Sequence, residues 1–364
     1  MKTLSINRLL LLGMVLYLAF PLLGSDEQIL GSDEQNKALK IGDITAAPGE
    51  VTSGFLIVPE KDNLEIKIPV TLINGKKPGK TLALVAGIHG YEYPPILALQ
   101  RLKSMISPDD LEGALILVHI ANPPAFQRRT IYYNPYDWKN LNRVFPGNPN
   151  GTAAERTAFI LTEEVVKKCD FLIDMHCGDG NEALIPYTYW MITGKDALDQ
   201  RSKELALAFG IEKIIMDKTR TKDLSESKYL GNTAVLLSKP AITIESGYLG
   251  RTDEEDIVRV VNGTLSVMKH LNMIKGSPDM VQKPVWIDKY QVIYSEKTGL
   301  FYPLKKMGQE VKKGEPVGFT TDYFGNKTSE LTAPFNGIVL YIINTPPANK
   351  GEPLFEIGHI KKSE

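Results

Sequence analysis

The stretch TLALVAGIHGYEYPPILAL, residues 81–99, decides the fold. Residues 81–86 form an uninterrupted apolar run, which is typical of a strand buried on both faces of a parallel sheet. Two prolines then open a predicted helix over 94–105, because proline is tolerated in the first turn of a helix. Between strand and helix lie His89 and Glu92. We therefore expect a buried strand that delivers two polar side chains to one tight turn.

The same alternation of strands and helices continues along the chain. Further strands are predicted at 53–58, 63–72, 114–120, 170–175, 211–216 and 241–244, and further helices at 153–168, 199–209 and 253–273. Strands that alternate with helices indicate an α/β domain, here a mixed sheet with helices on both faces. We expect this domain to cover residues 41–276.

The sequence pattern changes after Gly276. Residues 281–360 show short alternating runs that are broken by glycine and proline, such as TAPFNGIV and NKGEPLFEIG. Such runs are typical of a small all-β structure. We therefore predict an accessory β domain at 281–360 that follows the α/β domain.

The N-terminus has the pattern of a secretory signal. Lys2 and Arg8 precede and flank an apolar run at 9–23, which ends in small and acidic residues. This run is shorter than the roughly 20 residues that a spanning helix needs. We predict a signal peptide at 1–24, an unstructured linker at 25–40 and a periplasmic or secreted protein. A retained membrane anchor is the alternative, and it would be the chain's only link to a membrane.

The composition is that of a globular protein without an excess of basic residues. The net charge is −1, with 43% hydrophobic and 23% charged residues. These values are ordinary for a soluble globular protein. No basic excess indicates a nucleic-acid partner. The two cysteines, Cys169 and Cys177, are predicted to be buried thiols, since cysteine is among the most buried residue types.

Three residues suit a zinc site. His89 and Glu92 follow one predicted strand, and His176 follows another in FLIDMHCGDG. In open α/β sheets, sites form outside the carboxyl ends of the strands. Two imidazoles and one carboxylate are a ligand set for Zn²⁺ that leaves the fourth position open. The sequence therefore predicts one Zn²⁺ per chain, although each residue alone also suits an ordinary polar turn.

Other polar residues suit roles in hydrolysis. Glu245 ends the run PAITIE, where its carboxylate is placed to accept a proton as a general base. Asn142 and Arg143, in NLNRVFPG, offer an amide and a planar fork for a substrate carboxylate. An upstream arginine, Arg129 or its neighbour Arg128, is a candidate to stabilise an oxyanion.

Taken in order, the motifs GIHGYE, NLNRVFPG, DMHCG and ITIESG resemble the succinylglutamate desuccinylase/aspartoacylase family of the zinc carboxypeptidase clan. The resemblance implies the zinc ligands and the roles of Glu245, Asn142 and Arg143 given above. It implies an oxyanion role for an arginine near 129, and it implies that Asp174 orients the metal site. The segment 281–360 resembles the barrel-sandwich domain of lipoyl and biotinyl carriers, and we interpret it as an accessory lid or docking domain.

Two activities fit this resemblance. The first is a zinc-dependent amidohydrolase that cleaves the amide bond of a small N-acylated amino acid. The second is an exported zinc carboxypeptidase acting on short peptides or cell-wall fragments, because the Asn142–Arg143 pair suits a C-terminal carboxylate equally well. A binding protein without catalytic activity is a third possibility, which intact ligands and an intact Glu245 disfavour.

Overall fold

The computed structural model describes residues 36–61 and 64–361. The predicted signal peptide and most of the predicted linker lie outside these residues, so both stay predictions. The first described strand, β1, begins at Leu39, just before the predicted start of folded sequence. Within the two described ranges, no helix combines the length and the apolar character needed to cross a membrane.

The strands of the first part of the chain are β1 (Leu39–Ile41), β2 (Ile44–Ala46), β3 (Val51–Lys61), β4 (Leu64–Asn74), β5 (Lys77–Ala86), β6 (Glu112–Val118), β7 (Phe171–His176), β8 (Glu182–Leu184), β9 (Tyr187–Met191), β10 (Lys213–Asp217) and β11 (Ala241–Glu245). The helices are α1 (Tyr93–Met105), α2 (Pro123–Arg128), η1 (Leu141–Arg143), α3 (Ala153–Leu161), η2 (Thr162–Val166), α4 (Asp196–Phe209), η3 (Leu224–Glu226), α5 (Leu230–Leu236) and α6 (Glu254–His270). The later strands are β12 (Val285–Tyr294), β13 (Gly299–Pro303), β14 (Glu310–Val311), β15 (Pro316–Thr321), β16 (Lys327–Thr332), β17 (Gly337–Ile343), β18 (Pro347–Ala348) and β19 (Pro353–Ile360).

One large mixed sheet organises the described chain. Its strand order is β14-β17-β19-β12-β10-β9-β11-β7-β5-β6-β4-β3, with β8 paired to β17. The pairs around β5 and β7 are parallel, whereas β9 runs antiparallel to β11 and β4 runs antiparallel to both β3 and β6. This arrangement confirms the predicted α/β class with a mixed sheet.

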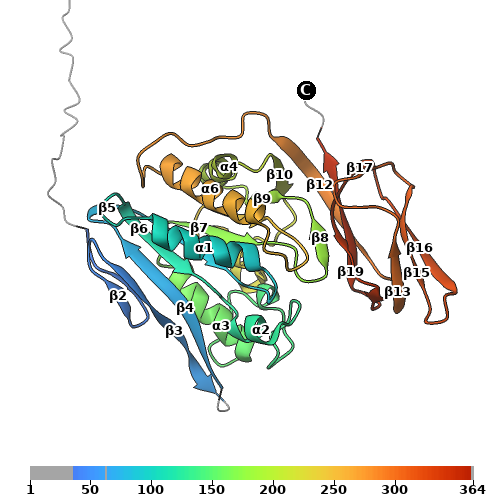
Figure 1. Cartoon of the computed structure of the whole chain (residues 1–364), viewed down its shortest axis with the longest axis horizontal. Coiled ribbons are helices and arrows are strands. Elements are labelled where there is room, and N and C mark those ends of the chain that lie inside the picture. The colour runs from blue at the N-terminus through green and yellow to red at the C-terminus, as the bar shows by residue number, and fades with distance from the viewer. Residues whose placement is uncertain (1–35, 62–63, 362–364) are drawn as a thin grey trace, which may run out of the picture. The chain divides into compact units, whose positions relative to one another are not determined.

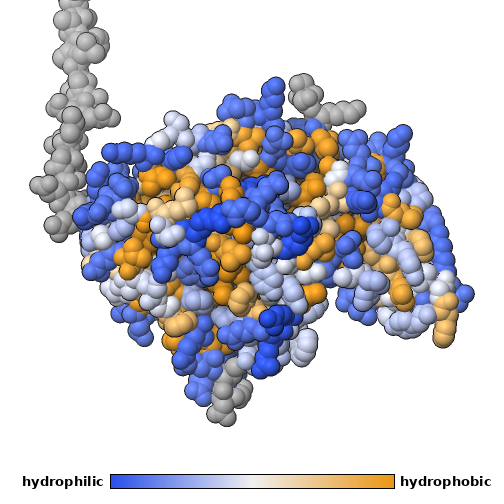
Figure 2. Space-filling view, in the orientation of Figure 1, coloured by the Kyte–Doolittle hydropathy of each residue, from blue (hydrophilic) through white to orange (hydrophobic). Residues whose placement is uncertain are grey.

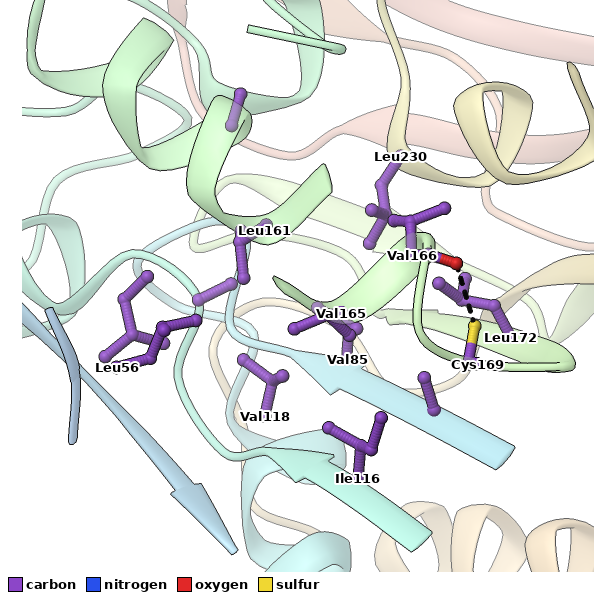
Figure 3. Close-up of a cluster of buried hydrophobic side chains, with 14 of the residues drawn as sticks. Leu56, Val85, Ile116, Val118, Leu161, Val165, Val166, Cys169, Leu172 and Leu230 are labelled. Atoms are coloured by element: carbon purple, nitrogen blue, oxygen red, sulfur yellow. Dashed lines mark hydrogen bonds between the residues drawn. The ribbon is translucent and has the colours of Figure 1, made fainter. Parts of the chain in front are cut away.

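Helices cover both faces of this sheet, as the side-chain alternation along β5 requires. Leu82 and Leu84 pack in one buried cluster with residues of α1, α4 and α6, and Figure 1 shows α1 and α6 side by side over the sheet. Ala83 and Val85 face the opposite cluster, which α3, η2 and α5 supply. Figure 3 shows part of this second cluster, with Val165 next to Val85. Residues 82–86 of β5 are apolar at every position, and they pack against one buried cluster on each face of the sheet.

Among the described residues, the segment after Gly276 contains strands and no helix, and part of it belongs to the large sheet. Strand β12 pairs in parallel with β10, so β12, β19, β17 and β14 extend the large sheet. The remaining strands form a four-stranded sheet in the order β16-β15-β13-β18. The described residues, 36–61 and 64–361, pack as one compact unit. The domain boundary between 276 and 281 therefore stays a prediction.

The structure differs locally from the predicted elements. The predicted helix at 153–168 ends as α3 at Leu161 and continues as the π-helical turn η2. Sequence analysis missed β9, whose residues YTYWM alternate weakly, and the short helix α5.

Cys169 and Cys177 are both free and buried, as predicted. The Cys169 thiol donates a hydrogen bond to the Val166 carbonyl oxygen, which Figure 3 draws as a dashed line. On the face drawn in Figure 2, apolar residues are interspersed with charged ones.

Gly263 provides a test of how closely α6 and α4 pack. A Cβ atom at Gly263 would lie 2.6 Å from the carbonyl oxygen of Phe209, which is backbone and has no room to move. Alanine favours a helix by up to about 1 kcal/mol over glycine, but overpacking a tight contact costs about 1–3 kcal/mol. We expect Gly263→Ala to lower the free energy of unfolding in urea titrations. The exposed neighbour Asn262, changed to alanine, is the control and should leave stability unchanged or slightly higher.

Candidate metal centre

Three parallel strands place the candidate site. Strands β5, β7 and β11 lie side by side, with Ala86 opposite Met175 and His176 opposite Glu245. His176 and Glu245 are thus the last residues of neighbouring strands. The turn after β5 carries His89 and Glu92 to the same edge of the sheet. The carboxyl ends of three strands therefore supply all four side chains.

His89, Glu92 and His176 form a compact buried cluster. One oxygen of Glu92, Oε1, lies 2.7 Å from Nδ1 of His89 and 2.9 Å from Nδ1 of His176. One ligand atom from each residue lies within 4.8 Å of the other two, and all three residues are buried. The structure thus brings together the three predicted metal ligands, although His176 lies 84 residues after Glu92 in the chain.

The outer ring nitrogens fix the orientation of both imidazoles. Nε2 of His176 lies 2.9 Å from Oδ1 of Asp174, and Nε2 of His89 lies 3.2 Å from Oδ1 of Asn140. If each Nε2 donates its proton outward, each Nδ1 presents a lone pair towards Glu92. Three lone pairs that converge in this way repel one another unless a proton or a cation lies between them. The donor set therefore fits Zn²⁺, and Asp174 has the position of a carboxylate that orients a metal-bound histidine.

Electrostatics also favour a cation at this cluster. Burial by itself raises the pKa of Glu92, but His176 and His89 outweigh it and lower that pKa to about 2. Burial by itself lowers the pKa of His176, yet the carboxylates of Asp174 and Glu92 raise it well above its usual value. The site therefore holds the Glu92 carboxylate in its charged form and attracts positive charge.

Glu245 has a free carboxylate oxygen beside the cluster. Its Oε2 is buried and has no hydrogen-bond partner among the described residues. Burial is the main cause that raises the pKa of Glu245 well above the usual value, with Glu92 and Glu182 adding to it and His176 opposing it. A buried carboxyl oxygen without a hydrogen-bond partner destabilises the folded state unless a ligand or a water molecule supplies the missing hydrogen bond. This oxygen is thus available to exchange a proton with a bound molecule.

Asn142 and Arg143 lie next to the metal ligands. The side-chain Oδ1 of Asn142 accepts a hydrogen bond of 3.0 Å from the Leu230 backbone amide, which leaves the Asn142 Nδ2 facing Nε2 of His176 at 3.3 Å. The Arg143 guanidinium lies over the Tyr229 ring, 4.8 Å from the centroid. Both residues line the same cavity as the metal ligands.

The structure does not bring Arg128 or Arg129 to this cavity. Helix α2 ends there, with Arg129 in the left-handed region at φ 52°, and both arginines are exposed. Neither side chain is part of the cavity lining. The oxyanion role predicted for Arg129 therefore has no support from the geometry. Only part of the loop that follows reaches the cavity. Tyr132 and Tyr133 line it, whereas Trp138 is 69% exposed.

The cavity extends well beyond the metal ligands. Its volume is about 1310 Å³. Tyrosines are prominent in its wall: Tyr132, Tyr133, Tyr187, Tyr189, Tyr229, Tyr290, Tyr294 and Tyr341. Several of these come from β9, β12 and β17, which sequence analysis did not place near the site. The C-terminal strands thus contribute directly to the cavity.

Tyr132 links the loop above the site to the segment after β7. Its hydroxyl lies 2.9 Å from Oε1 of Glu182, and its backbone amide donates to Asp179 Oδ2 at 2.8 Å. The Tyr132 ring meets the His89 ring edge-on, with centroids 5.9 Å apart. Mainly through burial, the pKa of Asp179 rises to about 6. These contacts hold one wall of the cavity against the metal ligands.

Glu356, on β19, is a second buried carboxyl in the cavity wall. It is 1% exposed, and the Tyr189 hydroxyl lies 3.3 Å from each of its oxygens. Burial raises the pKa of Glu356 to about 8, although the nearby Arg220 opposes the shift. Its sequence signal was a lone acidic residue inside the apolar run PLFEIG, which sequence analysis did not use.

With this geometry in place, comparison with known proteins identifies the class. The model of the "Succinylglutamate desuccinylase/Aspartoacylase catalytic domain" matches residues 78–271, and the chain belongs to this family of deacylating hydrolases. The N-alpha-acetyl-L-2,4-diaminobutyric acid deacetylase of Halomonas elongata is 28% identical over 325 residues, which cover 86% of this chain and 93% of that protein.

Solved structures agree with this assignment. The product-bound ectoine utilization protein EutE (DoeB) from Ruegeria pomeroyi has a TM-score of 0.75 and 25% identity, covering 88% of this chain and 100% of that one. A succinylglutamate desuccinylase/aspartoacylase from Rhodobacter sphaeroides also has a TM-score of 0.75 and 25% identity, covering 85% of this chain and 96% of that one. The similarity therefore extends over the C-terminal strands as well as the matched catalytic segment.

Removing one imidazole tests the metal centre. We expect His176→Ala to lose zinc in equilibrium dialysis, with affinity reduced by well over 100-fold, because even residues that only orient metal ligands are worth about 10–100-fold. Metal analysis of the dialysed protein measures this. His270→Ala is the control, since His270 lies away from the cavity lining and should leave zinc content unchanged. Equal zinc in both variants would show that this cluster is not the metal site.

Glu356 predicts a pH dependence of stability. A carboxyl whose pKa rises from 4.5 to about 8 on folding stabilises the native state at low pH, and this contribution disappears as pH rises through that window. Glu356→Gln cannot ionise, so its melting temperature relative to wild type should increase between pH 5 and 8. Thermal melts across this range check the trend. Glu255→Gln, at a side chain that is 84% exposed, should show no such trend.

Proposed function

We propose that this chain is a zinc-dependent amidohydrolase that removes the acyl group from a small N-acylated amino acid. The observation that carries the proposal is the buried His89–Glu92–His176 cluster beside the unpartnered Glu245 oxygen, in one cavity. The family, the deacetylase relative and the product-bound structure support the same chemistry.

In this proposal each group of residues has a separate role in the reaction. His89, Glu92 and His176 would hold Zn²⁺, which polarises a carbonyl and lowers the pKa of water when bound. Glu245 accepts a proton from the attacking water and delivers it to the leaving nitrogen as the C–N bond breaks. Asn142 and Arg143 bind the carboxylate of the amino acid and so fix the amide next to Glu245.

A peptide substrate is the second candidate. The cavity volume of about 1310 Å³ exceeds the roughly 300–1,000 Å³ that is usual for small-molecule pockets. A zinc carboxypeptidase would place a peptide's C-terminal carboxylate at Arg143 and extend the chain through the tyrosine-lined space. A comparison of the rates at which the protein hydrolyses N-acetyl amino acids, dipeptides and tripeptides distinguishes the two candidate activities.

Glu245→Gln tests the catalytic part of the proposal. The amide keeps the size of the side chain but cannot accept the proton, so we expect kcat to fall by about 10²–10⁴-fold while zinc content stays the same. Steady-state kinetics with a panel of N-acetyl amino acids, together with metal analysis, measure both quantities. Glu255→Gln, on the surface of α6, should retain wild-type kinetics. Unchanged turnover in Glu245→Gln would remove the general base from the proposal.

A further inference from the structure

We propose that the outer edge of β3 pairs with β3 of a second copy of this chain, so that two large sheets join in antiparallel fashion across a two-fold axis. This edge lies outside the catalytic segment, because the family match begins at residue 78 and β3 ends at Lys61. The pairing is therefore independent of the reaction that the metal centre supports.

Strand β3 is the last strand of the large sheet, and its outer edge is open. Within the described residues it pairs only with β4, and Figure 1 shows these two long strands side by side. Their register runs without a bulge as far as Val58, which lies opposite Ile66. The β1–β2 hairpin packs against one face of β3, where Leu56 and Val58 are buried. The opposite face and the edge remain available.

The odd-numbered residues of β3 direct their backbone groups to this open edge. The Asn74 amide donates to the Glu50 carbonyl at 2.9 Å, so even-numbered residues of β3 face β4. Since the direction of hydrogen bonding alternates along a strand, residues 51, 53, 55 and 57 face outward. None of these four makes a backbone hydrogen bond to another element among the described residues. The edge therefore offers a row of unused amides and carbonyls.

Apolar side chains accompany these backbone groups. Val51, Phe55 and Ile57 are 42%, 55% and 37% exposed. The stretch VTSGFLIVP, residues 51–59, has no charged residue. Like charges that face each other across a strand pair are destabilising, and pairing a strand with its own copy brings like charges together. The absence of charge therefore favours a second copy of this strand over a partner of opposite charge.

The other sheet edges in the described residues have features that prevent pairing. Strands β14 and β18 are two residues long, and β1 and β2 are three residues long. Strand β16, at an edge of the four-stranded sheet, carries Lys327 and Glu330. Short strands and charged side chains are the usual protection of a sheet edge. With one long uncharged edge per copy, the pairing closes at a dimer and does not continue as a fibre.

Pro59 limits the register of the pair. It is odd-numbered, so the position of its missing N–H faces the open edge, where a strand tolerates proline. A two-fold axis at Gly54 places Val51 opposite Ile57 of the second copy and keeps Pro59 outside the ladder. A shift of the axis by one or two residues towards Pro59 would bring it into the ladder and lose hydrogen bonds. With the axis at Gly54, the two Phe55 side chains are diagonal neighbours on one face, within reach of each other.

Light scattering after size-exclusion chromatography tests the proposal, and we expect the wild-type chain to be a dimer. Phe55→Lys removes an apolar contact and places two positive charges at diagonal positions, so the dissociation constant should rise by about 10- to 100-fold. Phe324→Lys is the matched control, because Phe324 is 90% exposed in the turn between β15 and β16. It should keep the wild-type mass. A monomeric wild type, or equal dissociation of both variants, overturns the proposal.

A mixture of two variants shows whether residue 55 meets its own copy. Phe55→Glu alone should dissociate as Phe55→Lys does, with the melting temperature of the monomer unchanged between them. An equimolar mixture of the two should form a heterodimer, because opposite charges then lie at the diagonal positions. A variant that is merely misfolded is not restored by mixing. If the mixture stays monomeric, the two Phe55 side chains are not neighbours and the proposed pairing is wrong.

Hydrogen exchange resolved to single residues distinguishes this edge from any other dimer surface. In the wild-type dimer the amides of residues 51, 53, 55 and 57 should exchange slowly, and in Phe55→Lys they should exchange quickly. The Thr52 amide faces β4 and should be protected in both proteins, which makes it the internal control. A wild-type dimer whose odd-numbered amides exchange as quickly as in the variant forms through another surface, and that result also overturns the proposal.

Discussion

The parallel pairing of β5, β7 and β11 is the constraint on which the site depends. Hydrogen bonds between neighbouring backbones set His176 opposite Glu245 and the end of β5 beside Met175. A shift of one residue in this register would turn every side chain to the opposite face. The two apolar cores on either side of β5 oppose such a shift, because each accepts only its own set of side chains. Packing far from the metal ligands thus determines where those ligands meet.

Much of this arrangement was predictable because it depends on local pattern. Apolar runs at strand length located β5, β7 and β11, and the polar residues directly after them named His89, Glu92, His176 and Glu245. Glu356 was not predictable in this way. It reaches the cavity only because β19 joins the large sheet. Contacts of this kind form between strands that are far apart in the sequence, so the spacing of residues within one segment cannot predict them.

The positions of the arginines also show where prediction from the sequence fails. Arg129 was favoured because it precedes the NLNR motif, yet α2 ends at that point and turns its basic side chains outward. Arg143 lines the cavity instead, and its guanidinium lies 4.8 Å from the centroid of the Tyr229 ring. The order of residues along the sequence suggested Arg129 or Arg128 for the oxyanion, but α2 ends at these residues and both are exposed.

The position of β19 has a consequence for folding. This strand lies between β12 and β17 in the sheet, although both of these strands precede it in the chain, so it must insert between them. Without β19 these neighbours have no backbone link, and the Tyr189 hydroxyl lacks the carboxyl that it meets. The cavity wall that carries Tyr189 and Glu356 is therefore complete only when β19 has paired with strands on both of its sides.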